Sequence, residues 1–300
     1  MDDFTFGIII GILAALFFAI QNVVVKWVGE DVRPVAANSI RVWVSLPVIL
    51  IITWNPFRQP NLALPLDTVI VLALSVFFAA GFGDVVFYES QDRIGVSTAF
   101  NISNTYPIVT YFFAILILGD IFIPIRFIGV LMAIAGIIMI SREQNIQYPD
   151  EPETKSSGLD RLGYIMAIST AIMFAFATIL VDIGVSGIDP LDANLVRVAF
   201  GSLMLMPNFY WARRKGMNLP SRRGIKIMAI AGIFGMAFAS IFWVASVKYI
   251  GATLSAVIGS ISPLFALPFS VKYLNERVNW KVGLGTLVTI FGIWVTLIAG

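Results

Sequence analysis

The 300-residue chain contains no cysteine and no histidine. The absence of cysteine excludes disulfides, thiolate metal sites and cysteine nucleophiles, and it leaves the redox compartment open. Without either residue, a zinc site would need carboxylates alone, and the usual proton-transferring base of hydrolases is missing. A Walker phosphate loop and a Gly-x-Ser-x-Gly nucleophile motif are also absent from the sequence. We therefore expect no enzyme, no metal and no cofactor.

Charged residues are scarce as well, at 13% of the chain, while 58% is hydrophobic and the mean hydropathy is +0.89. Soluble globular chains carry about 25% charged residues. A water-soluble fold could not bury so much apolar surface, so the composition predicts many membrane spans and no sizeable domain outside the membrane. The net charge of +2 gives no reason to expect nucleic-acid binding.

Apolar runs bounded by charged residues, proline or asparagine are long enough to cross a bilayer as helices. Ten such runs cover residues 6–26, 34–54, 68–90, 94–118, 122–140, 161–183, 191–211, 225–247, 251–272 and 279–298. The first run follows an acidic start without a basic segment or a cleavage pattern, so we expect a retained helix and not a signal peptide. The long polar stretch near the middle of the chain is rich in Pro, Glu, Ser and Lys, which is typical of a solvated linker.

An internal repeat emerges when the sequence is shifted by 156 residues, which aligns PVAANSIRV (34–42) with PLDANLVRV (190–198). The same frame, without a gap, matches Phe18 with Phe174, Gly95 with Gly251 and Pro107 with Pro263. Each half holds five predicted helices, an odd number, so the second half is expected upside down relative to the first. The predicted organisation is a first five-helix repeat (1–141), a polar linker (142–160) and a second, inverted repeat (161–300).

Basic residues indicate the orientation in the membrane. The predicted turns after helices 1, 3, 5, 7 and 9 carry fifteen Lys and Arg residues, and the turns on the other side carry three. Because positive charge stays on the cytoplasmic side, both termini are expected outside and the central linker inside. The strongest anchor, WARRKGMNLPSRRGIK (211–226), is interpreted as a topological signal and a contact for anionic lipid. We expect a multi-pass protein of the plasma membrane or the bacterial inner membrane.

Two stretches share an acidic residue followed by spaced glycines: GDIFIPIRFIGVLMAIAGIIMI (119–140) and NERVNWKVGLGTLVTIFGIWVTL (275–297), each after a helix with a mid-span proline. With the Pro-x-x-Ala-Asn-x-x-Arg block of each half, they resemble the drug/metabolite transporter superfamily, specifically its EamA-like members, over essentially the whole chain. The resemblance implies a ten-helix basket around a central cavity that works by alternating access without ATP. Many members keep their termini in the cytoplasm, whereas the basic residues here indicate the outside, so the direction of transport stays open.

Ionisable side chains within a span cost about 2.5 to 3.5 kcal/mol at the bilayer centre, so their presence needs a reason. Arg41 and Asp84 lie at similar depths in two predicted helices and carry opposite charges. We predict that they meet, either as a gate or protonatable coupling site or as a fixed structural ion pair. Gln21, Asn22 and Tyr88 are predicted to complete the lining of the substrate site. Asn38, three residues before Arg41, is predicted to orient its guanidinium.

The repeat makes Arg197 the equivalent of Arg41, but Ser240 replaces the aspartate, so Arg197 lacks the corresponding acidic partner. A guanidinium stays charged in proteins. It therefore either binds another anion, which would be Asp182 or a substrate carboxylate or phosphate, or extends to the membrane interface. Asn194, three residues before Arg197, is predicted to orient its guanidinium. Trp243, one turn beyond Ser240, is predicted to complete the lining of the substrate site. The remaining aromatic residues are interpreted as lipid-facing or interfacial.

Polar residues precede the proline in each of the two mid-span segments. Proline removes a backbone donor and frees carbonyls, which membrane proteins tolerate where the backbone lines a cavity. We predict that these segments form the floor of the substrate site; simple kinks with Ser and Thr packing are the alternative. The residues are Asn101, Asn104 and Thr105 before Pro107, and Ser260 and Ser262 before Pro263.

The predicted fold is an all-α integral membrane protein of ten transmembrane helices, arranged as two inverted five-helix repeats around a central cavity. The predicted function is secondary active transport, by export or exchange, of a small organic metabolite such as an amino acid. Protons or the substrate's own gradient would drive it, and a monomer would suffice. A membrane-embedded enzyme and a drug-efflux protein of broad specificity are the alternatives, while a receptor or assembly factor fits an inverted repeat poorly.

Overall fold

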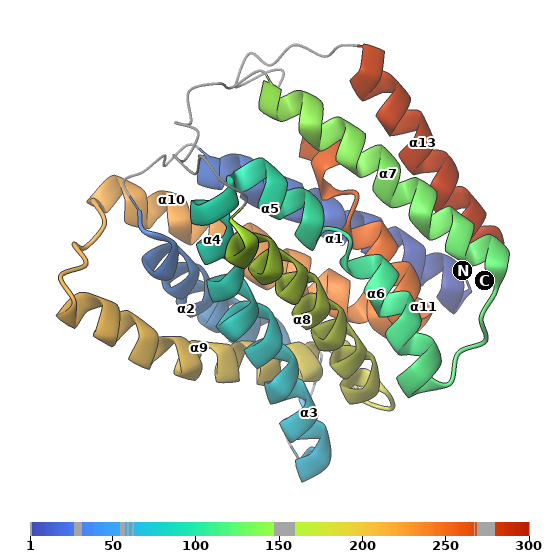
Figure 1. The fold of residues 1–300 in the computed structure, drawn as a ribbon. Helices are drawn as coiled ribbons and strands as arrows, with labels where there is room; N and C mark the ends of the chain where they lie inside the picture. Colours follow the sequence, from blue (N-terminus) through green and yellow to red (C-terminus); the bar gives the residue numbers. More distant parts are fainter. Residues whose placement is uncertain are drawn as a thin grey trace.

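The computed structural model describes residues 2–26, 32–54, 58, 60–61, 63–146, 160–266, 268 and 280–299. Most of these residues are helical, and no strand occurs among them (Figure 1). Seven helices in the described part are long and apolar enough to cross a membrane. Large apolar side chains point outward from them, for example Leu116 at 78% and Leu287 at 66% exposure, as expected for surfaces in contact with lipid. The chain is therefore an all-helical, multi-pass membrane protein.

The described helices divide between the two halves of the chain. The first half contains α1 (Asp3–Lys26), α2 (Pro34–Thr53), α3 (Leu66–Val76), α4 (Phe82–Ile94), α5 (Val96–Ser103), α6 (Tyr106–Phe113) and α7 (Pro124–Ile146), with π-helical segments η2 (Phe77–Gly81) and η3 (Ala114–Leu118). The second half contains α8 (Arg161–Val185), α9 (Pro190–Arg214), α10 (Arg222–Gly232), the π-helical η4 (Ile233–Ala239), α11 (Ser240–Gly259) and α13 (Trp280–Ile298).

Several predicted segments fall partly outside the described residues, among them the ninth predicted span (251–272), of which residues 267 and 269–272 lie outside. α7 continues to Ile146, past the predicted end of the first repeat at residue 141, and residues 147–159 of the predicted linker lie outside. Residues 275–279, which open the second acid-and-glycine stretch, lie outside as well. The count of ten transmembrane helices therefore stays a prediction.

Several local irregularities recur 156 residues apart. α3 and α10 each run into a π-helical segment, η2 and η4, and the two segments begin at equivalent positions. Gly95 and Gly251 have positive φ angles of 82° and 77° and interrupt helical stretches, a conformation that glycine adopts readily. Residues 104–105 and 260–261 form equivalent turns. A duplicated sequence is expected to show such pairs of equivalent irregularities. The inverted orientation of the second half remains a prediction.

Proline and capping side chains set the start of several helices. α2 and α9 both begin at proline, which lacks the N–H that a helix start leaves unpaired. Asp160 caps α8, because its Oδ1 accepts from the Gly163 backbone N at 3.1 Å, and its Oδ2 accepts from Arg93 at 3.4 Å. The hydrogen bond from Gly163, followed by the contact with Arg93, holds the pKa of the Asp160 carboxyl below its usual value.

Helices far apart in the sequence pack in pairs. α1 lies against α11, α2 against α9, α4 against α8 and α7 against α13, and Figure 1 shows α7 and α13 side by side. α7 and α13 approach closely because glycine faces small residues. A Cβ on Gly136 would lie 2.6 Å from the Thr289 backbone N, and one on Gly285 would lie 2.9 Å from the Gly136 carbonyl oxygen. Small residues allow membrane helices this close approach.

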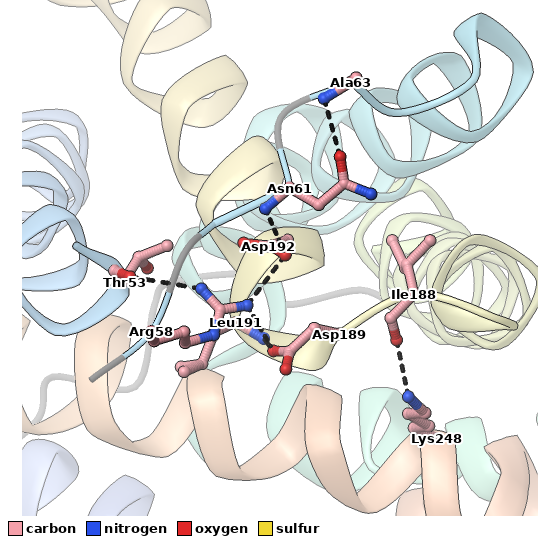
Figure 2. A network of polar contacts seen from close by, with 9 residues as sticks. All are labelled: Thr53, Arg58, Asn61, Ala63, Ile188, Asp189, Leu191, Asp192 and Lys248. Atoms are coloured by element: carbon pink, nitrogen blue, oxygen red, sulfur yellow. Dashed lines mark hydrogen bonds and ion pairs between the residues drawn. The ribbon is translucent and has the colours of Figure 1, made fainter. Parts of the chain in front are cut away.

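A polar network joins the end of α2 to the start of α9 (Figure 2). Nη2 of Arg58 lies 2.9 Å from Asp189 Oδ1 and 2.9 Å from Asp192 Oδ2. Asp192, at 3% side-chain exposure, also accepts a backbone hydrogen bond from the segment before α3. Trp43, in the middle of α2, donates to the Ser202 carbonyl in the middle of α9 at 3.0 Å. The two helices therefore run antiparallel.

Candidate functional site

A cavity of about 250 Å³ lies between α1, α2, α4, α5, α8 and η4, so both halves of the chain contribute to it. Six side chains predicted from the sequence line it: Gln21, Asn22, Arg41, Asp84, Tyr88 and Asn104. The other lining residues are Phe18, Phe87, Phe100, Ser103, Phe174 and Met236. The structure thus brings together residues from positions that are far apart in the sequence.

Arg41 is held in place by hydrogen bonds at the wall of this cavity. Its Nη2 donates to Asn38 Oδ1 and to the Tyr88 hydroxyl, both at 3.2 Å. The Asn38 amide in turn donates to the Ala80 carbonyl at 2.9 Å, and Ala80 belongs to the π-helical segment η2. The amide three residues before Arg41 therefore ties the guanidinium to the neighbouring helix.

Asp84 borders the same cavity from α4. Arg41 borders it from α2, and the two charged groups are farther apart than the 4.0 Å of an ion pair. Arg41 and Asp84 therefore share a cavity without a direct ion pair. Opposite charges interact strongly in a low-dielectric interior, so this arrangement suits a ligand that carries both signs.

Two buried atoms of the cavity residues have no hydrogen-bond partner among the described residues. They are Arg41 Nε, a donor, and Gln21 Oε1, an acceptor, and both residues are 6% exposed. Buried polar atoms without partners are rare and cost about 1 to 3 kcal/mol each. A ligand with an acceptor toward Arg41 and a donor toward Gln21 would satisfy both once Gln21 Oε1, which lies against Gly235, turns toward the cavity.

The apolar wall of the cavity was not predicted. Phe18, Phe87, Phe100 and Phe174 line it together with Met236, whereas the sequence interpretation assigned these aromatic residues to lipid contact. The internal repeat could have identified two of these phenylalanines as cavity residues. Phe18 and Phe174 are equivalent under the 156-residue shift, and a residue kept in both halves of a repeat is a candidate for the region where the halves meet.

The second arginine lies in a separate buried cluster. Arg197 is 7% exposed, its Nε donates to Ser75 Oγ at 2.9 Å, and its Cζ lies 5.3 Å from the centre of the Trp243 ring. Asn194 Oδ1 accepts from Ser240 Oγ at 2.6 Å. Arg197, Asn194, Ser240 and Trp243 thus lie near one another, and none of them lines the cavity described above, although Trp243 was predicted to line it.

The acidic partner considered for Arg197 makes a different contact. Asp182 Oδ2 accepts from the Ala252 backbone N at 2.6 Å, directly after the kink at Gly251. Within the described ranges, no carboxylate lies within 4.0 Å of the Arg197 guanidinium. The same ranges contain no group of three or more acidic side chains arranged to hold a metal ion.

The two mid-span segments break their helices at equivalent points. The chain turns at residues 104–105, between α5 and α6, and again at residues 260–261, after α11. Tyr106, directly after the first turn, donates its hydroxyl to the carbonyl of Ala256, shortly before the second, at 3.1 Å. The two breaks therefore contact one another across the halves of the chain.

The polar residues at these breaks have different surroundings. Asn104 lines the cavity. The hydroxyls of Thr105 and Ser260 each donate at 2.7 Å to the carbonyl three residues earlier, so they stabilise their own helix ends. Asn101 Oδ1 is buried without a partner among the described residues, and Ser262 is half-buried. Neither Asn101 nor Ser262 lines the cavity.

Comparison with known proteins identifies relatives along nearly the whole chain. The sequence profile of the EamA-like transporter family matches residues 5–142 and 161–298, two segments with the same 156-residue offset as the repeat. An "Uncharacterized transporter" of Archaeoglobus fulgidus is 23% identical over 291 residues, covering 97% of this chain and 98% of that protein. A solved structure titled "Crystal structure of protein" has a TM-score of 0.75 at 14% identity, covering 97% of this chain and 96% of that one. Because the sequence identity to this solved structure is only 14%, the similarity is evidence for a shared fold alone.

Proposed function

This chain belongs to the EamA-like transporter family, and from that membership we propose that it exports or exchanges a small amino acid by alternating access. The cavity beside Arg41 is the proposed binding site. One observation carries the proposal: two unpartnered buried atoms, Arg41 Nε and Gln21 Oε1, belong to residues that line a cavity also bordered by the Asp84 carboxylate. Membership in a transporter family favours a solute site over the active site of a membrane-embedded enzyme.

The charges of the cavity match those of an amino acid. A substrate carboxylate would accept hydrogen bonds from the Arg41 guanidinium, and charge-assisted bonds of this kind are among the strong ones. The substrate ammonium would donate to Asp84 and to Gln21 Oε1. Both unpartnered atoms would then be satisfied, and binding would add no net charge to a buried region, which lowers the desolvation cost.

The size and the apolar wall narrow the substrate class. The cavity volume of about 250 Å³ lies just below the roughly 300 to 1,000 Å³ of typical ligand pockets. Phenylalanine rings supply apolar surface for a substrate side chain. These features support a small amino acid and weigh against broad-specificity drug efflux, which needs room for larger molecules.

Alternating access follows from the organisation that we propose: ten spans in two inverted halves, the first ending with α7 at Ile146 and the second beginning with α8 at Arg161. In inverted-repeat transporters the substrate site lies near the midplane between the halves, and rocking of the halves exposes it to each side in turn. The antiparallel packing of α2 and α9 and the recurring helix breaks support this organisation. One chain supplies both halves, so a monomer suffices.

Protons are the proposed coupling ion, and Asp84 is the proposed carrier. Protonation of Asp84 would remove the charge that attracts the substrate ammonium, so proton binding and substrate binding would be linked. Asp84→Asn should abolish uptake driven by a proton gradient, whereas exchange should persist with a lower substrate affinity, because asparagine keeps the shape of the side chain and lacks the charge that attracts the ammonium. Asp67→Asn, the same change at an exposed position of α3, is the matched control. Gradient-driven uptake that persists in Asp84→Asn would eliminate the coupling role.

The proposed site is tested by exchange of radiolabelled amino acids in proteoliposomes that contain the purified protein. We expect saturable exchange of at least one small amino acid, with its affinity lowered about tenfold or more in Arg41→Gln, because a charge-assisted hydrogen bond contributes about 1.5 to 3 kcal/mol. Arg126→Gln is the control, since Arg126 donates to the Ala299 carbonyl and does not line the cavity. Exchange of other metabolites but of no amino acid would contradict the proposed substrate, and equal losses in both variants would contradict the site.

A further inference from the structure

Arg197 and Asn194 form a buried site with unused hydrogen-bond donors. They lie on one face of α9, three residues apart, at 7% and 0% exposure. Arg197 Nε is bonded to Ser75 Oγ at 2.9 Å, yet the described chain has no carboxylate within ion-pair distance of this guanidinium. Asn194 Nδ2 is buried without a partner among the described residues. The site therefore combines an uncompensated positive charge with a free amide donor.

The neighbouring side chains leave these donors free for a ligand. Ser240 Oγ donates to Asn194 Oδ1 at 2.6 Å, so the amide carbonyl is occupied and Nδ2 is the available group. The Trp243 ring lies 5.3 Å from Arg197 Cζ and interacts with the face of the guanidinium, while the N–H groups point outward along its edge. A guanidinium cannot become neutral in a protein, so the site gains stability when an anion binds.

We propose that Arg197, Asn194 and Trp243 form a second binding site, separate from the cavity, that takes a compact anion with a single negative charge. Because Asn194 is fully buried, a large group could not reach its Nδ2, so the proposed anion is small. Its two candidate sources share one chemistry: a free inorganic anion such as chloride, or the carboxylate of the transported substrate, in which case the site rests on the proposed function. Because Trp43 contacts Ser202 and α2 and α9 are antiparallel, the site lies about 10 Å from Arg41 along the helix axes.

The test uses a substitution that introduces a carboxylate next to Arg197, in place of the bound anion. Asn194→Asp keeps the shape of the side chain and adds a carboxylate beside Arg197. Asn208→Asp makes the same change at an exposed position of the same helix and serves as the control. Arg197→Gln removes the positive charge. Thermal unfolding of each purified protein is measured at constant ionic strength while sodium isethionate is replaced by sodium chloride or sodium acetate.

We expect chloride or acetate to raise the Tm of the wild type and of Asn208→Asp by about 2 °C or more at saturation, because a ligand of the folded state stabilises it. Asn194→Asp should not respond, and its Tm without added anion should equal or exceed that of the wild type. A response to chloride identifies an inorganic anion, and a response to acetate alone identifies a carboxylate.

An equal Tm in all three salts for the wild type would overturn the proposal, as would an undiminished response in Asn194→Asp. If Arg197→Gln folds poorly, the two asparagine variants decide the question alone. Failure of the proposed function is a separate result. Proteoliposomes without amino-acid exchange, made from protein that retains its anion response, would contradict the transport proposal and leave this site standing.

Discussion

Arg58 contacts two carboxylates at the same distance in different environments, which allows the effect of burial to be measured on one arginine. Asp189 Oδ1 and Asp192 Oδ2 both lie 2.9 Å from its Nη2, and their side chains are 48% and 3% exposed. Solvent screens an exposed pair, which contributes about 0 to 1 kcal/mol. Breaking a buried pair leaves an uncompensated charge and costs about 3 to 5 kcal/mol.

Asp192→Asn should therefore lower the free energy of unfolding by about 3 kcal/mol, the lower end of that range, because Arg58 keeps its contact with Asp189. Asp189→Asn should lower it by less than about 1 kcal/mol. Asp189 also accepts from the Leu191 backbone N at 2.8 Å as the cap of α9, but asparagine caps helices equally well. The substitution thus removes the charge and retains the cap.

The assay is unfolding of the purified protein by SDS in mixed micelles, followed by circular dichroism. Each aspartate variant is combined with Arg58→Gln in a double-mutant cycle, which isolates the interaction of the pair. The coupling should be large for Asp192 and close to zero for Asp189. Equal couplings, or a larger loss in Asp189→Asn than in Asp192→Asn, would refute the reasoning that burial sets the strength of these contacts.

Three further results are expected. Gly235→Ala should lower substrate affinity in the exchange assay, because the new Cβ would lie 2.8 Å from Gln21 Cγ and displace that side chain; an unchanged affinity would remove Gln21 from the site. Gly136→Ala should destabilise the protein by about 1 to 3 kcal/mol through overpacking against α13, whereas Gly283→Ala, with nothing within 4 Å, should not. The pKa of the Asp160 carboxyl is lower in the folded protein than its ordinary value of about 4. The ionised carboxylate therefore stabilises the folded protein above about pH 4, and this stabilisation is lost as the pH falls through the lowered pKa. Asp160→Asn should weaken the acid dependence of the Tm in that window, and an identical dependence would argue against the cap.

The membrane class and the helix breaks could be predicted because each follows from one dominant physical effect. No soluble fold can bury a chain that is 58% hydrophobic, so composition alone decides the class. Proline lacks a backbone donor and restricts the residue before it. The chain accordingly turns at residues 104–105 and 260–261, just before Pro107 and Pro263.

The lining of the cavity could be predicted only in part, because hydropathy does not tell a lipid-facing residue from a cavity-facing one. Phe82 and Phe87 lie in the same helix, yet Phe82 is 49% exposed and Phe87 lines the cavity. The π-helical segment η2 lies immediately before them. A π-helical turn holds an extra residue and rotates the helix that follows, so regular helical spacing counted from α3 gives the wrong direction for side chains of α4.

The two arginines have equivalent places in the repeat and different partners, and this difference determines which ligands each region favours. Arg41 shares its cavity with Asp84, so that cavity is neutral before a zwitterion binds and neutral afterwards. The residue equivalent to Asp84 is Ser240, and the groups around Arg197 are uncharged. An uncompensated buried charge costs several kcal/mol, so the Arg197 cluster favours a ligand with net negative charge. A single difference between the halves, aspartate against serine, would therefore give the two proposed sites different preferences, one for a ligand without net charge and the other for an anion.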